Sequence, residues 1–500
     1  MKLSNLERKL SEIDNLLAEH HLQKIITGFY NGELLERKRS EILLEALHYL
    51  KGKSRVEIKG EKIHYWLREA IISQIENSNS VMTLRKEIEE KVLQYWSKQR
   101  LGYMERQKIL ENSDSRKARK EAWCTVLPLA KLLSGSFTAL VKRRNEEAQR
   151  WGFADYAELI LNLNKLQKKG IVHLCRRLLG KTRDEYFSHL GEITRNLGLP
   201  SIAPWDIFYL SSFSNNLTLD IEIDLEPNDF LNLLFQKLGW QWQKMPIEIR
   251  YYEIPYGGLC FNFISKRKSI ILLNRQRKPD LITYITLAHE MAHAIQNALV
   301  RKSVSYIDII GEPSFIKEGT AEFIGYLVLD KGILEGLYRV NIEQQFLRNV
   351  YKHFMQRRKA WLRRQAVDAI FEINLYQFGP EEAESMYDTL TRKYLRIDKG
   401  SRNTWLTDII FCSHPIYLYN YILAEDLKVG IEQRLWKMGI PFLSPQAGKF
   451  LQSNFFSTSG EVPWIQKVKN IWSSGYLKQM SLSFACKSFC DILKMKINER

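Results

Sequence analysis

The distribution of proline is the sequence feature that most constrains this fold. The chain has only 13 prolines in 500 residues, and none precedes Pro128. Because proline interrupts a helix, its absence allows long unbroken helices throughout the first quarter of the chain. Apolar residues there recur every three or four positions, as at Leu43, Leu47 and Leu50, which is the period of amphipathic helices that pack on one another. We therefore expect a stack of helices in this quarter and a second helical block over residues 122–197.

Between residues 200 and 275 the pattern changes to that of strands. Residues 217–223 alternate strictly between apolar and polar, and residues 247–252 and 269–274 are apolar runs with β-branched side chains. A further strand is expected at 259–263, after Gly257 and Gly258. These segments predict a small sheet, in which an edge strand at 258–262 or 270–273 would be able to pair with an extended peptide. From Pro279 the pattern returns to helix almost to the C-terminus.

Charge and cysteine content limit the class of protein. The chain has 74 Lys and Arg against 57 Asp and Glu, a net charge of +17, which invites a nucleic-acid partner. The basic clusters are short, dispersed and mostly interleaved with acids at helical spacing, so we expect a basic surface or a cationic cleft instead. Six dispersed cysteines without a CxxC pair, and the lack of a signal peptide or of any run of about 18 apolar residues, predict a cytoplasmic protein without a membrane span.

The most informative segment carries the residues His289-Glu290-Met291-Ala292-His293. In a helix, two histidines four residues apart lie on one face, where both imidazoles are able to bind a single Zn²⁺. Glu290 points beside that face, close enough to accept a proton from water without being a ligand. Apolar residues surround most of this helix, which predicts that it is buried. Two histidines and a glutamate in such a helix are costly unless a cation partners them.

Two glutamates compete for the third ligand position that a catalytic zinc requires. Glu312 precedes Pro313, where the chain is biased to an extended or turn geometry. Glu318 lies inside an apolar-periodic segment, and a helix fixes a ligand better than the end of a loop does, so Glu318 is favoured. Glu322, one helical turn further on, is then placed to accept the other N–H of a ligand histidine, unless it is an ordinary surface carboxylate.

Four segments together resemble the oligoendopeptidase F and thimet oligopeptidase family of zinc peptidases, relatives of the angiotensin-converting-enzyme family. Along the chain they are residues 113–123, 140–156, 204–209 and 269–293, which is the order of the corresponding segments in the family. The resemblance implies a mainly α, two-lobed helical metallopeptidase with a deep central cleft and a small β-sheet next to the zinc helix. It implies a helical N-terminal lobe at 1–200 that forms one cleft wall, a catalytic region at 201–450 and a C-terminal helical segment at 451–500. The family's longer ligand spacing also selects Glu318.

The same family has a histidine followed by a tyrosine-rich helix that lines the cleft. Here the corresponding residues are His414 and then Tyr417, Tyr419 and Tyr421. The resemblance implies that His414, with Tyr421 or Tyr419, donates hydrogen bonds to the substrate oxyanion, a role that suits neutral imidazole and phenol groups. Which of the tyrosines faces the cleft stays open. The chain departs from the family at Ala292 and Gln296, where glycine and often histidine stand.

These features predict a metalloendopeptidase of the HExxH gluzincin type with one Zn²⁺ per chain. His289, His293 and Glu318 hold the metal, and Glu290 is the general base for hydrolysis of short peptides. One alternative is a catalytically silent peptide-binding or regulatory protein on the same scaffold, and another is a basic nucleic-acid-binding protein. The sequence does not distinguish internal from terminal cleavage, and it does not give the oligomeric state or the metal used in the cell.

Overall fold

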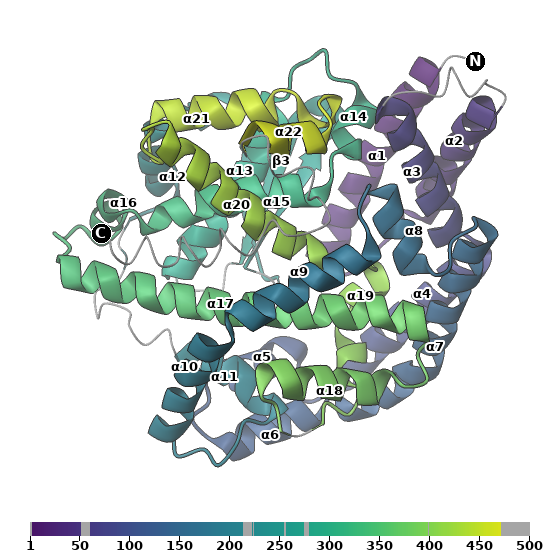
Figure 1. Cartoon of the computed structure of the whole chain (residues 1–500). Helices are drawn as coiled ribbons and strands as arrows, with labels where there is room; N and C mark the ends of the chain where they lie inside the picture. Colours follow the sequence, from purple (N-terminus) through teal and green to yellow (C-terminus); the bar gives the residue numbers. More distant parts are fainter. Residues whose placement is uncertain are drawn as a thin grey trace. The chain divides into compact units, whose positions relative to one another are not determined.

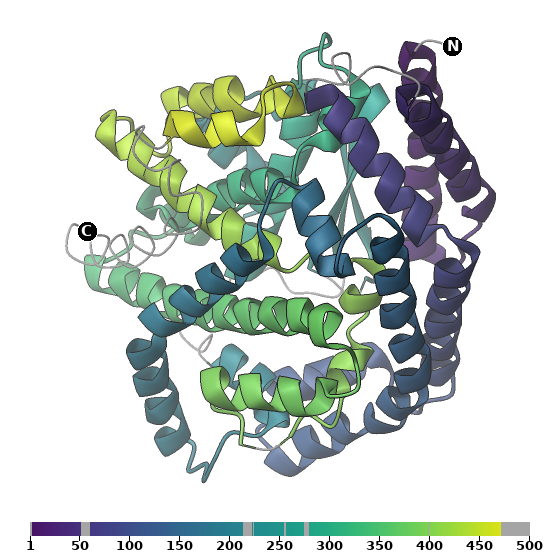
Figure 2. The same ribbon diagram turned by 45° about the vertical axis from the view of Figure 1, so that its right-hand side comes forward.

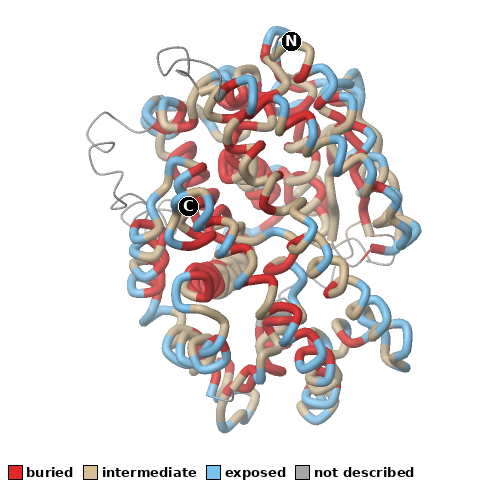
Figure 3. The backbone as a smooth tube through the Cα atoms, turned by 90° about the vertical axis from the view of Figure 1, so that its right-hand side faces the viewer, coloured by how far each residue is buried: buried red, intermediate tan, exposed pale blue. Residues whose placement is uncertain are grey.

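Helices make up most of this computed structural model, which describes residues 3–51, 61–213, 223, 225–254, 257–274, 280–398 and 400–471. A three-stranded sheet accompanies them, so the expected mainly α class with a small sheet is confirmed. Along individual helices the tube in Figure 3 alternates between buried and exposed residues, as the amphipathic sequence pattern predicts. The predicted strand at 217–223 lies almost wholly outside the described residues.

Contacts divide the chain into two units that each combine segments distant in sequence. The first unit contains Met1–Asn77, Leu219–Leu347 and Leu423–Met480, and the second contains Ser78–Thr218, Arg348–Ile422 and Ser481–Arg500. This division follows contacts and not chain order, and the domain boundaries expected near residues 200 and 450 stay a prediction.

The first unit contains the sheet and the helices around it (Figure 1). Its elements are α1 (Leu3–Thr27), α2 (Glu33–Lys51), α3 (Glu61–Glu76), α12 (Pro227–Lys237), β1 (Ile247–Tyr252), β2 (Gly258–Phe263), β3 (Lys268–Asn274), α13 (Leu281–Leu299), α14 (Tyr306–Gly311), α15 (Ser314–Tyr326), α16 (Lys331–Tyr338), most of α20 (Tyr419–Lys437), α21 (Pro445–Leu451) and α22 (Trp464–Ile471).

Among its described residues the second unit contains helices joined by loops and one isolated β-bridge between Ile202 and Ile397, but no strand. Its elements are α4 (Asn79–Ser97), α5 (Tyr103–Asn112), α6 (Arg116–Cys124), α7 (Leu127–Arg150), α8 (Tyr156–Leu163), α9 (Lys168–Lys181), α10 (Arg183–Asn196), α11 (Ile207–Phe213), most of α17 (Gln344–Phe378), α18 (Ala383–Leu395), α19 (Ile410–Ser413) and the first turn of α20.

Of the described residues, one stretch, Arg116–Arg150, is long and apolar enough to cross a membrane by length and composition. In this stretch 44% of the apolar window is buried inside the protein, and α7 packs on α4. Core helices of soluble proteins have the same composition, so the lack of a membrane span stays a prediction.

The sheet is drawn as teal arrows in Figure 2. Its strand order is β1-β3-β2, with β1 parallel and β2 antiparallel to β3. Ile271 of β3 is opposite Ile249 of β1 and Cys260 of β2. Helix α13 packs on one face of the sheet, and α1 packs on the other through Leu22, which joins a buried cluster with Phe263. The central position of β3 rules out 270–273 as an edge, and of the two alternatives only 258–262 remains.

Candidate active site

Helix α13 places the two histidines of the sequence motif on one face. The helix begins after Asp280, whose Oδ1 accepts the Thr283 N–H at 2.7 Å, so that local capping fixes its first turn. The rings of His289 and His293 meet edge to face, with centroids 4.8 Å apart, and their Nε2 atoms are 3.1 Å apart. The two nitrogens therefore point at the same position.

Helix α15 brings the Glu318 carboxylate to that position. Its Oε2 lies 3.4 Å from His289 Nε2 and 3.9 Å from His293 Nε2. The circle through these three atoms, calculated from the three side lengths, has a radius of about 2.0 Å. Zinc bonds to imidazole nitrogen and carboxylate oxygen are about 2.0–2.2 Å long. One cation near the centre of this circle would thus contact all three atoms, and the donor set of two imidazoles and a carboxylate fits zinc.

Helix α15 packs on two neighbours in the first unit, α13 and α20 (Figure 1). A Cβ atom at Gly325 would lie 3.4 Å from Ile285 O of α13, which is an ordinary contact. A Cβ atom at Gly319 would lie 2.9 Å from Ala424 O of α20, a separation that only glycine permits. Glu318 thus stands on a helix whose position is fixed from two sides.

The electrostatic environment of the site gives its two histidines different pKa values. Burial works against a charge on His289, but its hydrogen bond to Glu318 and the charges of Glu322 and Glu290 raise its pKa to about 9. Burial lowers the pKa of His293 to about 4. Without a cation His289 binds a proton more readily than His293 does, and a dication at the same position would compete with that proton.

Glu290 has the environment of a general base. Burial raises its pKa to about 7, helped by Glu318 and opposed by His289 and by the backbone N–H of Cys260. A base with a pKa near neutrality is efficient at physiological pH. Strand β2 approaches this carboxylate closely, because a Cβ atom at Gly258 would lie 3.1 Å from Glu290 Cγ. The sequence alone did not predict that Gly258 lies close to Glu290, although Gly257 and Gly258 marked the start of a strand.

Glu312, the rival for the third ligand position, has a different environment. It is 3% exposed and forms a buried ion pair with Lys467 of α22. Its Oε2 also accepts hydrogen bonds from Gln296 Nε2 at 3.2 Å and from Ser459 Oγ at 3.1 Å. Gln296, one of the departures from the family pattern, thus joins α13 to the segment that precedes α15.

Glu322 lies one turn beyond Glu318 on α15 and is partly buried. Its charge acts on His289, where it contributes to the raised pKa. Its proximity is compatible with the expected role as an acceptor for a ligand histidine.

The histidine and tyrosines of the distal motif belong to the second unit. His414 is exposed, with Nδ1 2.9 Å from Ser413 Oγ, and its ring lies 6.0 Å from that of Tyr417. Tyr421 is partly buried and packs edge to face on Tyr417, whereas Tyr419 is only 4% exposed. Of the two tyrosines predicted as donors, Tyr421 offers more accessible surface.

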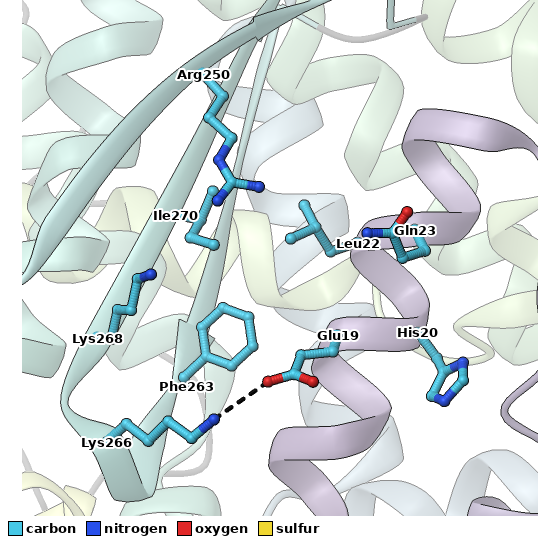
Figure 4. Close-up of a pocket in the computed structure, with 9 residues that line it drawn as sticks. All are labelled: Glu19, His20, Leu22, Gln23, Arg250, Phe263, Lys266, Lys268 and Ile270. Carbon is cyan, nitrogen blue, oxygen red and sulfur yellow. Dashed lines mark hydrogen bonds and ion pairs between the residues drawn. The ribbon is translucent and has the colours of Figure 1, made fainter.

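A separate cavity of about 420 Å³ lies between α1 and the face of the sheet that is remote from α13 (Figure 4). It is lined by three cations, by three apolar side chains and by three further polar side chains: Arg250, Lys266, Lys268, Leu22, Phe263, Ile270, Glu19, His20 and Gln23. These cations are paired, Lys266 with Glu19 and the other two with Glu248. The cavity does not contain any of the predicted catalytic or metal-binding residues.

No family model and no curated protein matches the sequence. The structure, in contrast, is similar to solved peptidase structures. An X-ray structure assigned to oligoendopeptidase F aligns with a TM-score of 0.73 and 12% identity, over 100% of this chain and 92% of that one. PZ peptidase A with an inhibitor aligns with a TM-score of 0.69 and 12% identity, over 98% and 91%. The M32 carboxypeptidase from Deinococcus radiodurans R1 aligns with a TM-score of 0.66 and 10% identity, over 99% and 98%. The chain therefore shares the fold of these helical peptidases.

Proposed function

We propose that this protein is a zinc-dependent peptidase that hydrolyses peptide bonds of short peptides. The observation that carries the proposal is the convergence of His289, His293 and Glu318 on one point with the spacing of zinc ligands. The shared fold of helical peptidases and the buried carboxylate of Glu290 beside this point support it.

The positions of His289, His293, Glu318 and Glu290 support the following roles. Bound zinc would polarise the scissile carbonyl and lower the pKa of a water molecule. Glu290 accepts the proton of that water at its carboxylate and passes it to the leaving amine, which requires a pKa near neutrality. The resemblance assigns to His414 and Tyr421 the donation of hydrogen bonds to the substrate carbonyl oxygen, and this remains a prediction.

We infer internal cleavage of short peptides from the resemblance to oligoendopeptidases. Strand β2 supports this, because it is an edge of the sheet and begins beside Glu290, so that a peptide paired with it would pass the general base. Carboxypeptidases share the fold as well. Peptides blocked at both ends distinguish the two activities, because an endopeptidase cleaves them and a carboxypeptidase does not.

The test combines metal analysis with cleavage. Purified wild type is expected to contain about one zinc per chain and to cleave members of a quenched fluorescent peptide library. Glu290→Gln should retain the metal and lose about 10³-fold or more in kcat. Glu381→Gln, at an exposed carboxylate paired with Lys142, is the control and should cleave as wild type does. Cleavage by Glu290→Gln at the wild-type rate would refute the mechanism.

The same measurements separate the alternatives. A silent peptide-binding protein would bind zinc and peptides without product, and a nucleic-acid-binding protein would shift an oligonucleotide in a salt-dependent manner. We also propose a cytoplasmic location, supported by the cysteines of the described residues, which are free thiols at Cys124, Cys175, Cys260 and Cys412.

A further inference from the structure

The turn that follows His414 contains a strained backbone conformation. Ile416 has a φ of +55° and its side chain is 3% exposed. The other described non-glycine residues with positive φ are lysine, arginine, asparagine or serine. A β-branched side chain is sterically disfavoured in the left-handed region. Such strain persists only where surrounding contacts impose it, and it is concentrated at functional sites.

A buried carboxylate on α17 supplies one of these contacts. The Ile416 N–H donates to Glu372 Oε1 at 2.7 Å, and Glu372 is 2% exposed. Burial raises the pKa of Glu372 to about 8, while the Ile416 N–H and Arg144 oppose that rise. A carboxyl group in either protonation state has an oxygen that accepts this bond. Removing the acceptor would leave a buried N–H without a partner at the strained residue.

Arg144 on α7 holds the other side of the same turn. It is fully buried, and its Nη2 donates to the Cys412 carbonyl oxygen at 2.8 Å. Its Nη1 donates to the Tyr376 hydroxyl at 3.2 Å, one turn along α17 from Glu372. His414 therefore lies between two backbone groups, one on each side, that are hydrogen-bonded to buried ionisable side chains of two different helices.

We propose that Glu372 is a positioning residue that holds Ile416 in its strained conformation and, together with Arg144 at Cys412, fixes the direction of the His414 side chain. The inference rests on the proposed function only where it assigns His414 a part in the reaction. A turn held at a strained residue has one defined conformation, whereas a relaxed turn would allow the exposed imidazole to sample several.

The first test compares two substitutions of Glu372. Glu372→Gln keeps the shape of the side chain and an acceptor oxygen. The values of kcat and KM should therefore stay within about threefold of wild type, and the pH profile of kcat should keep its shape. Glu372→Leu removes the acceptor, and kcat should fall by about 10- to 100-fold with KM changed by less than about threefold. Equal effects of the two substitutions, or none from either, would overturn the proposal. If Glu372→Leu does not fold, Glu372→Asp withdraws the oxygen by about 1.5 Å and should give the same split between kcat and KM.

The second test does not depend on peptidase activity. In protein labelled with ¹⁵N only at histidine, the His414 imidazole signals, assigned with His414→Gln, should shift or broaden in Glu372→Leu and keep their position in Glu372→Gln. Hydrogen exchange of a peptide that spans 412–418 should accelerate only in the leucine variant. If no peptide is cleaved but these signals behave as expected, the proposed function fails and the positioning role stands. If wild type cleaves peptides and the signals are unchanged in Glu372→Leu, the positioning role fails alone.

The third test examines strain directly. Glycine adopts a positive φ without penalty, so in an Ile416→Gly background Glu372→Leu should perturb the His414 signals less than it does in wild type. Equal perturbation in both backgrounds would show that Glu372 does not act on the backbone of Ile416.

Discussion

A single methyl group at Gly319 should displace Glu318, the proposed third metal ligand. The Cβ atom of alanine would lie 2.8 Å from Leu427 Cδ2, 2.9 Å from Leu427 Cβ and 2.9 Å from Ala424 O. Carbon atoms in contact are normally about 3.5–4.0 Å apart, so the two helices must separate by about 0.5–1 Å. The Leu427 Cδ2 atom is able to move by rotation of the side chain, but Leu427 Cβ and Ala424 O are fixed to the backbone of α20 and are not.

The movement acts on metal binding because Glu318 directly precedes Gly319. The three ligand atoms now lie 3.1, 3.4 and 3.9 Å apart, and a metal site tolerates errors of only about 0.2 Å in its bond lengths. We expect Gly319→Ala to lower zinc affinity about 10- to 100-fold, as loss of support around a ligand does. Overpacking should also lower the free energy of unfolding of the metal-free protein by about 1–3 kcal/mol.

Gly325→Ala is the matched control on the same helix. Its Cβ atom would lie 3.4 Å from Ile285 O and 3.7 Å from His289 Cβ, which are ordinary contacts. Alanine also favours the helix by about 1 kcal/mol over glycine, so this variant should bind zinc as wild type does and unfold at the same or a higher temperature. Affinity is measured by competition with a chromophoric chelator, and stability by thermal unfolding of the metal-free proteins. Wild-type affinity in Gly319→Ala, or an equal loss in both variants, would refute the argument that packing of α15 places Glu318.

Three further predictions concern the base, the buried ion pair and a buried acid. Gly258→Ala brings a Cβ atom to 3.1 Å from Glu290 Cγ, so kcat should fall about 10-fold while zinc content stays unchanged; a loss of zinc would contradict this. Lys467→Met leaves the buried Glu312 carboxylate without its ion pair, so chemical denaturation should show a loss of about 3–5 kcal/mol, largely recovered in Glu312→Gln/Lys467→Met, with zinc bound in both. If Glu312 is a ligand after all, the double variant will not bind zinc. Burial raises the pKa of Glu372 from 4.5 to about 8, so the folded protein retains a proton that the unfolded chain releases, and stability falls as pH rises between these values. Glu372→Gln should therefore be more stable than wild type above pH 8, by up to about 5 kcal/mol, and an unchanged pH dependence of unfolding would exclude this titration.

The parts of the structure that the sequence predicted depend on local chemistry. Helix α13 follows from the apolar residues that surround most of it, and the strands predicted at 247–252, 259–263 and 269–274 follow from short apolar runs between turn residues and agree with β1, β2 and β3 to within one residue. The preference for Glu318 over Glu312 also used local information, because one lies within a helical pattern and the other precedes a proline. In the structure Glu318 stands on α15 and faces both histidines.

The parts that the sequence did not predict depend on residues far apart in the chain. Lys467 is 155 positions from Glu312, and without it the buried environment of that carboxylate is not visible in the sequence. The strand order places the third strand of the chain at the centre of the sheet, so proximity in sequence misassigns one of the two possible edges. Likewise, Glu372 and Ile416 are 44 positions apart, and the sequence around either residue does not predict their hydrogen bond.

Three glycine residues show how a local sequence feature depends on contacts between residues far apart in the chain. Gly258, Gly319 and Gly325 carry no functional group, yet each stands where a strand or helix comes close to an element that holds a site residue. The chemistry at Glu290 and Glu318 requires placement to within a few tenths of an ångström, and close backbone packing provides it more rigidly than long side chains do. Tolerance of alanine at these three positions should thus follow the contact distances in the structure, poorest at Gly319, intermediate at Gly258 and best at Gly325. Helix propensity alone predicts a different result, because it favours alanine equally at the two helical positions.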